Sequence, residues 1–254
     1  MNTAYLKEED RRLLDHTADL CRAAQQRYQS RFTPFLDERQ QRLVQGVLRE
    51  FPEVTGRFYG GWEEAARAML GIFPPYEEPA EDAFPLCPVT LLFRREDSVG
   101  HRDILGALMG LRIKREAVGD ILPGEGFAVL FVTRPVLPVV LSELTKIGRV
   151  GIEPQEGLPR GLPPSGGFVE IQGTVSSLRL DSLVALLTRE SRERAAGLVR
   201  AGLVTLEYEV CTQVSHPVAE GDTLSVRGYG KYAVDAVGGV SKKGRIHLRC
   251  KKFQ

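Results

Sequence analysis

Residues 191–204, SRERAAGLVRAGLV, combine groups that could hold an anion at the start of a short helix. Ser191 is a suitable N-cap because its hydroxyl can accept a backbone N–H of the first turn, and Gly202 can end the helix in the left-handed conformation. Arg192 and Arg194 lie in the first turn, where cations oppose the helix dipole. Free N–H groups of a helix N-terminus and two guanidinium groups together favour a phosphate ligand.

The two arginines have a second interpretation, in which they pair in solvent with Glu190 and Glu193. The distribution of charge along the chain helps to decide between a phosphate ligand and these solvent pairs. The net charge is +1, but from Ser165 onward 13 Lys and Arg face 9 Asp and Glu, whereas the first 164 residues hold the other 21 and 24. From Ala236 to the end there are six cations and no acid. A basic C-terminal part on a nearly neutral chain favours a polyanion partner.

The elements that position this helix follow from the surrounding pattern. Residues 166–254 predict a strand at 168–175, a helix at 179–188, the helix from Ser191, and several strands after Gly202. In the last strand, RIHLRCK, cationic residues alternate with apolar ones, which predicts a half-buried strand with one charged face. No acid interrupts that face in the sequence, which favours a polyanion.

Two stretches rich in Pro and Gly, 71–88 and 151–167, predict domain boundaries. They divide the chain into residues 1–72, 85–153 and 166–254, and the fold class is α+β.

The first part is predicted to be helical. Thr33 and Pro34 are typical of an N-cap followed by proline at the first helical position, and apolar residues then recur at helical spacing over 43–51. The segment WEEAARAML at 62–70 predicts a further helix.

The middle part predicts the order βαββαβ, which is typical of ferredoxin-like and RNA-recognition-motif sheets. Its third strand, EGFAVLFV, partly matches the motif that stacks RNA bases. It departs from the motif at Glu125, where a cation is expected, and at Val129, where an aromatic residue is expected, and the first strand has Thr90 instead of an aromatic residue. We therefore interpret Phe127 as a core residue.

Other chemistry finds little support in the sequence. HRD at 101–103 matches the start of a protein-kinase catalytic loop, but Leu108 stands where that loop needs Asn, and no nucleotide-binding glycine loop is present. Dispersed Cys and His residues predict no metal site, and we expect no cofactor. Asp103 and Asp120 are the acids of the middle part worth testing for catalysis. Without a membrane-length apolar stretch or a secretory signal, a cytoplasmic protein is expected.

The C-terminal third resembles the S-four RNA-binding domain, also called the alpha-L motif. The resemblance is carried by Arg179-Leu180-Asp181, Ser191-Arg192 with Ala195 following, Gly202-Leu203-Val204, Gly221-Asp222 and Ser225-Val226-Arg227-Gly228. In that family two helices and an adjoining strand form an L whose basic face binds structured RNA. One departure is Glu207-Tyr208-Glu209, where the pattern usually has an Asn-containing turn.

Together with GHRDILGALMGLRIKREAVGDI at 100–121, this domain makes the chain similar to the YlmH family of bacterial S-four proteins over nearly its full length. The resemblance implies a non-enzymatic protein that binds rRNA or tRNA on the large ribosomal subunit in quality control of stalled translation, with peptidyl-tRNA as a further partner. The alternatives are an RNA-modifying enzyme related to pseudouridine synthases and an adaptor in cell division that docks through its N-terminal part.

Two groups of residues are candidates for RNA contact. The C-terminal group consists of Arg179, Ser191, Arg192, Arg194, Arg200, Arg227, Lys231, Lys242, Lys243 and Arg245. A second contact in the middle part would use His101, Arg102, Arg112, Lys114 and Arg115.

Overall fold

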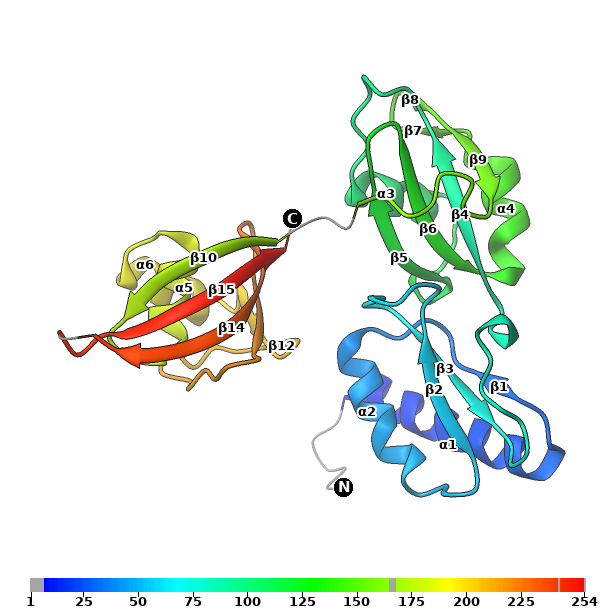
Figure 1. The fold of residues 1–254 in the computed structure, drawn as a ribbon, viewed down its shortest axis with the longest axis horizontal. Helices are drawn as coiled ribbons and strands as arrows, with labels where there is room; N and C mark the ends of the chain where they lie inside the picture. The colour runs from blue at the N-terminus through cyan, green and yellow to red at the C-terminus, as the bar shows by residue number, and fades with distance from the viewer. Residues whose placement is uncertain (1–6, 165–167, 242, 254) are drawn as a thin grey trace. The chain divides into compact units, whose positions relative to one another are not determined.

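The structure is a computed structural model and describes residues 7–164, 168–241 and 243–253 (Figure 1). Its internal contacts divide the chain into two compact units, Met1–Ser165 and Gly166–Gln254. The predicted N-terminal and middle parts therefore lie within one unit. Lys242, a candidate for RNA contact, lies outside the described residues.

The N-terminal part of the first unit is mixed rather than purely helical. Its elements are α1 (Glu8–Arg27), β1 (Arg31–Phe32), α2 (Glu38–Leu48), β2 (Thr55–Tyr59) and β3 (Met69–Phe73), and the antiparallel strands have the order β1-β3-β2. Leu70 and Ile72 of the central strand pack against Cys21, Ala24 and Val44 from the two helices. The helices thus cover one face of a small sheet.

Two predictions for this part were wrong. The helix expected at 62–70 is absent, because Asp120 of a later strand accepts hydrogen bonds from the backbone N–H groups of Ala66 (2.8 Å) and Arg67 (3.0 Å). Tertiary contacts thereby override the local helix propensity. The helix expected from Pro34 begins instead at Glu38, with Asp37 as its N-cap.

Thr33, expected to cap that helix, has another role. Its hydroxyl accepts the N–H of Leu70 in β3 at 2.9 Å, so it extends the contact between β1 and the central strand.

The middle part has the predicted βαββαβ order, but its last strand lies at 153–156, within the stretch 151–167 that was predicted to be a domain boundary. Its elements are β4 (Leu86–Leu92), α3 (His101–Gly110), β5 (Val118–Pro123), β6 (Phe127–Thr133), α4 (Leu137–Glu143) and β9 (Glu153–Glu156), with a small hairpin of β7 (Lys146–Ile147) and β8 (Val150–Gly151). The antiparallel sheet has the order β5-β6-β4-β9, as in ferredoxin-like folds. Short 3₁₀ turns lie at Glu81–Ala83, Arg115–Ala117 and Arg134–Val136.

The two faces of this sheet have different neighbours. On one face, alternate residues of β4 and β6 such as Val89 and Leu130 pack against α3 and α4. On the other face, Val129 and Phe131 are fully buried in a cluster with Phe35 and Phe73 of the N-terminal part. Both faces are therefore covered within the first unit.

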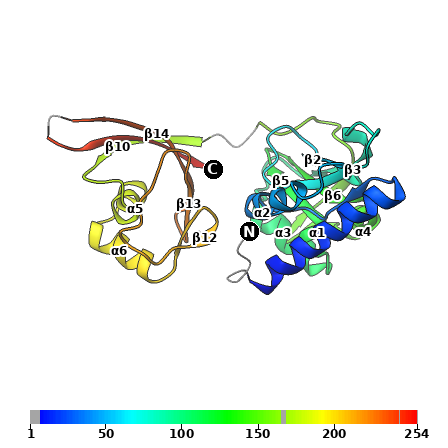
Figure 2. The same cartoon turned by 90° about the horizontal axis from the view of Figure 1, so that it is seen from below.

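The second unit is a six-stranded antiparallel sheet with two helices. Its elements are β10 (Phe168–Val175), α5 (Leu180–Thr188), α6 (Arg192–Arg200), β11 (Val204–Leu206), β12 (Glu209–Val210), β13 (Thr223–Val226), β14 (Gly230–Val240) and β15 (Ile246–Phe253), in the sheet order β10-β15-β14-β13-β11-β12. The helices lie together on one side of the sheet (Figure 2). Leu180, Val184 and Val199 of the helices share a core with Tyr232 and Leu248 of the strands.

Candidate nucleic-acid interface

The helix α6 begins and ends as the sequence predicts. The Ser191 hydroxyl accepts the backbone N–H of Arg194 at 3.2 Å, which satisfies one donor of the first turn. At the other end Gly202 has a φ of 67°, and its N–H donates to the Val199 carbonyl. These two caps fix the length and direction of the helix that carries the candidate arginines.

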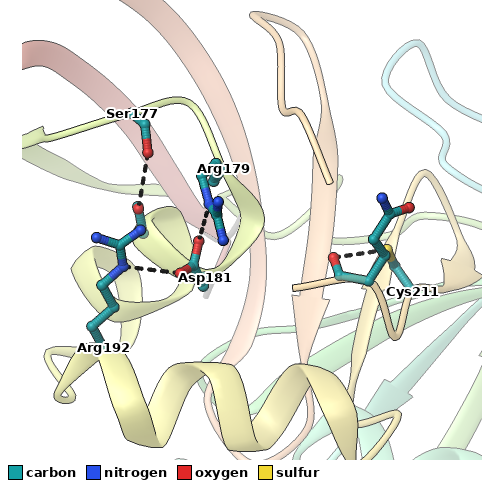
Figure 3. A network of polar contacts seen from close by, with 7 residues as sticks. Ser177, Arg179, Asp181, Arg192 and Cys211 are labelled. Carbon is teal, nitrogen blue, oxygen red and sulfur yellow. Dashed lines mark hydrogen bonds and ion pairs between the residues drawn. The ribbon is translucent and has the colours of Figure 1, made fainter. Parts of the chain in front are cut away.

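The charge in the first turn of α6 has a partner that the sequence analysis did not identify. Asp181, in the first turn of α5, accepts a hydrogen bond from Arg192 Nε at 2.9 Å and one from Arg179 Nε at 3.1 Å (Figure 3). The Asp181 side chain is only 5% exposed, whereas those of Arg192 and Arg179 are 53% and 41% exposed. One buried carboxylate therefore holds two arginines by their Nε atoms.

The electrostatics of this arrangement favour an ionised Asp181. Burial of the carboxyl group raises its pKa, but the hydrogen bonds and charges of Arg192 and Arg179 outweigh burial, so the pKa lies below its ordinary value of 3.8. The carboxylate also shows why Arg192 is tolerated in the first turn. Arg192 forms its ion pair with Asp181 rather than with Glu190 or Glu193, the solvent partners considered from the sequence.

Arg194 has a different environment. It is exposed and lines a groove of about 630 Å³ that runs along α6, together with Ser191, Gly197 and Leu203. Its charge lies near the hydroxyl of Tyr229, which donates to Glu190 at 2.9 Å. Arg192 and Arg194, alike in sequence, therefore differ in structure: the first is held by a buried carboxylate and the second lies at an open groove.

The C-terminal end of α6 carries two further exposed candidates. Arg200 is in the last turn of the helix, and Arg227 follows β13. The backbone N–H of Arg227 donates to the carbonyl of Leu203 at 2.9 Å, which places it beside the segment that follows α6. Arg200 and Arg227, far apart in the sequence, thus both lie near the C-terminal end of α6.

The remaining candidates of this unit, Lys231, Arg245 and Lys243, differ in their surroundings. Lys231 has its ammonium group 5.1 Å from the Tyr208 ring centroid and 5.5 Å from that of Phe253. Arg245 Nε donates to the Thr174 hydroxyl at 2.8 Å and lines a second groove, of about 370 Å³, together with Arg192. Lys243 is exposed in the turn between β14 and β15.

The charged face of β15 differs from the prediction. Leu248 and Cys250 are buried and their neighbours are more exposed, so the predicted alternation is confirmed. However, Asp235 of β14 forms ion pairs with both Arg249 and Lys251. The face is therefore partly neutralised, because strand pairing brings in an acid that is remote in the sequence.

The unusual turn at 207–209 also has a structural explanation. Glu207 and Tyr208 have φ values of 48° and 67°, the two positive angles of a hairpin turn that normally favours Asn and Gly. The Glu207 carboxylate accepts the backbone N–H of Thr223 at 2.7 Å. This carboxylate binds within the sheet, which compensates in part for the unfavourable residue type.

Two candidates of the middle part, Arg115 and His101, differ from the rest of their group. Arg115 donates to the carbonyls of Val118 (2.6 Å) and Gly119 (3.3 Å), and burial together with the charge of Arg67 lowers the pKa of Arg115 to about 10. Desolvation by the surrounding groups and the charge of Arg115 also lower the pKa of His101, which favours the neutral form of this exposed side chain at pH 7.

Three other candidates of that group, Arg102, Arg112 and Lys114, are exposed. Lys114 lies 3.8 Å from Glu116, a distance typical of a weak surface pair.

The sheet face that would stack bases in an RNA-recognition motif is inaccessible. Thr90 is fully buried, and its hydroxyl donates to the carbonyl of Gly157 at 2.8 Å. Val129 and Phe131 are covered by the N-terminal part, and Phe127 packs at the margin of that cluster with Arg160 above its ring. Phe127, predicted to be a core residue, is partly buried and packs against that cluster.

The two acids considered for catalysis make structural hydrogen bonds. Asp103 accepts the N–H of Gly100 at 2.9 Å at the start of α3, and Asp120 accepts Trp62 Nε1 at 3.1 Å in addition to two backbone N–H groups. Within residues 7–164, 168–241 and 243–253, no group of three or more His, Cys, Asp and Glu is arranged to hold a metal ion. No helix in the described part of the chain is both long and apolar enough to span a bilayer.

Two family models match regions of the chain. The model described as "Putative RNA-binding domain in YlmH" matches residues 84–157, and the S4 domain model matches residues 178–224. The "Ribosome-associated protein quality control protein P2" of Bacillus subtilis (strain 168) is 34% identical over 243 residues, which are 95% of this chain and 94% of that protein. The chain belongs to the YlmH family.

A solved structure is similar to part of the chain. It is titled "Cell division protein ylmH from Streptococcus pneumoniae" and has a TM-score of 0.53 with 21% identity, covering 60% of this chain and 93% of that one. At this identity the similarity shows the fold alone. Membership of the YlmH family and the S-four domain were both predicted from the sequence, and both are confirmed.

Proposed function

We propose that this protein is a non-enzymatic factor that binds rRNA on the large ribosomal subunit and acts in quality control of stalled translation, in the cytoplasm. The observation that carries the proposal is the α6 surface of the S-four domain. Arg179 and Arg192 are held by Asp181 and remain about half exposed, while Arg194 and Arg200 are exposed at the two ends of the helix. The match to a ribosome-associated relative over nearly the full length supports the ribosome as the partner.

The chemistry of this surface suits RNA phosphates. Each of the two held arginines uses Nε for Asp181, so the N–H groups at the tip of each guanidinium can bind phosphate oxygens by charge-assisted hydrogen bonds. Structured RNA is recognised largely through its shape, phosphates and 2′-hydroxyl groups. A rigid basic surface without a base-stacking platform therefore fits rRNA, or the helical part of a peptidyl-tRNA.

The absence of catalysis is part of the proposal. Asp103 and Asp120 are both occupied as acceptors of structural N–H groups, which supports roles in folding. An RNA-modifying enzyme would lose its modified nucleotide when its essential acid is changed. We expect Asp103→Asn to leave the nucleotide composition of rRNA unchanged in cells that carry the variant in place of the wild type.

Co-sedimentation of the full chain with separated ribosomal subunits tests the main proposal. We expect binding to the large subunit that weakens steeply as salt is raised, because phosphate contacts release counterions. Mild RNase treatment of the subunits should abolish it. Binding to neither subunit, or binding that survives both treatments, would refute the proposal.

A further inference from the structure

The middle part matches a model described as RNA-binding, but its sheet cannot perform that role in the way of an RNA-recognition motif. Thr90 and Val129, which stand at stacking positions of its central strands, are fully buried, and Phe127 at the third such position is partly covered. The N-terminal part and the segment after β9 cover them. Any contact with RNA must therefore use another side of this part of the protein.

The helical side of the sheet presents a group of cations from two adjoining elements. The α3 helix and the β7 strand contact one another, and Ile147 of the hairpin packs into the same core as α3. Exposed cations lie on these elements and on the segment that follows α3, and we call them the α3–hairpin surface: Arg102, Arg112, Lys114, Lys146 and Arg149.

Among the described residues, the acids of this region form one ion pair with the surface. Glu116 lies 3.8 Å from Lys114, while Asp103, whose carboxylate accepts the N–H of Gly100, and Glu143 at the end of α4 are exposed. In the described part of the chain, no ion pair joins Arg102, Lys146 or Arg149 to an acid. Cations without internal partners leave their charge available to a polyanion.

The sequence of α3 contains a second indication. Gly106 and Gly110 lie one turn apart in this ten-residue helix, and a Cβ added at either would meet no described atom within 4 Å apart from its chain neighbours and the nearby backbone of the helix itself. Glycine in a helix is unfavourable relative to alanine, and packing within this chain does not require it here. Glycines between Arg102 and Arg112 let an external backbone approach the helix closely.

We propose that the α3–hairpin surface binds the phosphate backbone of RNA as a second contact of this chain, separate from the S-four surface. The inference deepens the proposed function and rests on it, because it names the part of the middle domain that faces the RNA. It retains Arg102, Arg112 and Lys114 from the sequence-based group and adds Lys146 and Arg149. It removes Arg115, which binds backbone carbonyls, and His101, whose neutral form is favoured at pH 7.

The first test removes charge from this surface in the full chain. The triple variant Arg102→Gln, Lys146→Gln and Arg149→Gln is compared with Arg12→Gln, Arg22→Gln and Arg27→Gln, which removes three exposed cations of α1. Binding to rRNA fragments is titrated at several salt concentrations. We expect the α3–hairpin variant to lower the log–log salt slope by about 3, because each phosphate contact contributes about 0.9, and the α1 variant to leave it nearly unchanged.

The second test separates binding from stability. Gly106→Ala should raise the melting temperature of the first unit, because alanine favours the helix and meets no clash, yet weaken RNA binding several-fold by adding a methyl group at the contact. A purely structural helix would give the higher melting temperature with unchanged binding. That result would overturn the proposal.

The outcomes also distinguish this proposal from the function on which it rests. If the wild type binds no RNA, the proposed function fails. If the wild type binds RNA and Arg200→Gln weakens it, but both triple variants bind like the wild type, only the second contact is refuted. If the α3–hairpin variant binds rRNA fragments normally but loses a ribosomal protein from its cross-linked products, the surface faces a protein, and the proposal is wrong.

Discussion

Arg192 and Arg194 are two residues apart in one helical turn, but we predict that changing each to alanine has a different effect on stability. Arg192→Ala leaves the Asp181 carboxylate, 5% exposed, with Arg179 as its remaining partner. Removing one partner of a fully buried ion pair costs about 3–5 kcal/mol, whereas an exposed pair is worth about 0–1 kcal/mol. Because the Arg192 side chain is 53% exposed and one partner remains, an intermediate loss of about 1.5–3 kcal/mol is expected.

Arg194→Ala is the matched control. It removes a cation from the same turn, which relieves an unfavourable dipole interaction of about 0.3–1 kcal/mol, and it breaks no contact with a buried carboxylate. Its stability should therefore stay within about 0.5–1 kcal/mol of the wild type. For a domain as small as the second unit, 1 kcal/mol shifts the melting temperature by about 4–8 °C. The two variants should consequently melt at clearly different temperatures.

The assay is chemical and thermal unfolding of the full chain, followed by circular dichroism, with RNA titrations of the same samples. Asp181→Ala combined with Arg192→Ala completes a double-mutant cycle, and the coupling between the two residues should exceed about 1 kcal/mol. Equal and small losses for Arg192→Ala and Arg194→Ala, with no coupling to Asp181, would show that the buried ion pair does not stabilise the domain.

Three further outcomes are expected. The pKa of Asp181 is lowered in the folded protein, so its contribution to stability is present above the ordinary pKa of 3.8 and is lost as pH falls through the lower folded value. Asp181→Asn should therefore flatten the acid limb of the curve of stability against pH. An unchanged acid limb would contradict this. Asp120→Ala leaves three N–H groups without their acceptor and should destabilise the first unit by about 2–4 kcal/mol, measured by urea unfolding, without changing the salt slope of RNA binding. Phe131→Ala should lower the free energy of unfolding by about 3–5 kcal/mol, because this ring is fully buried between the two sheets of the first unit. A loss below about 1 kcal/mol would mean that the two sheets do not pack together through this ring.

Local signals in the sequence were sufficient for several elements. The caps of α6 depend on Ser191 and Gly202, which act within a few residues of themselves, and both were predicted correctly. The βαββαβ order of the middle part follows from alternating apolar patterns of ordinary length, and the sheet order β5-β6-β4-β9 agrees with it. Such features need no knowledge of distant residues.

The errors arise where a distant residue decides the local structure. The segment 62–68 has helix-forming residues, but Asp120, more than fifty positions later, binds its N–H groups and holds it in another conformation. The partner of Arg192 was missed for a related reason, since Asp181 lies on the preceding helix. Asp181 lies in the first turn of α5 and Arg192 in the first turn of α6, and both belong to the S-four pattern. Their equivalent positions in that pattern were the signal that could have suggested the ion pair.

The charged face of β15 illustrates the same limit for candidate site residues. Its cations alternate as predicted, but the acid that neutralises Arg249 and Lys251 belongs to the neighbouring strand. Strand register, which local sequence does not specify, decides which charges remain available. The exposure of Arg194, Arg200 and Arg227 is likewise a property of the folded S-four domain.

In the proposed complex, the α6 surface of the S-four domain contacts rRNA on the large ribosomal subunit. The most direct measurement is an electron cryo-microscopy map of the full chain bound to purified large subunits. We predict that Arg179, Arg192, Arg194 and Arg200 lie within hydrogen-bonding distance of rRNA or tRNA phosphates, with Asp181 still between Arg179 and Arg192. A map in which the α6 surface faces solvent, or contacts only ribosomal proteins, would contradict the claim.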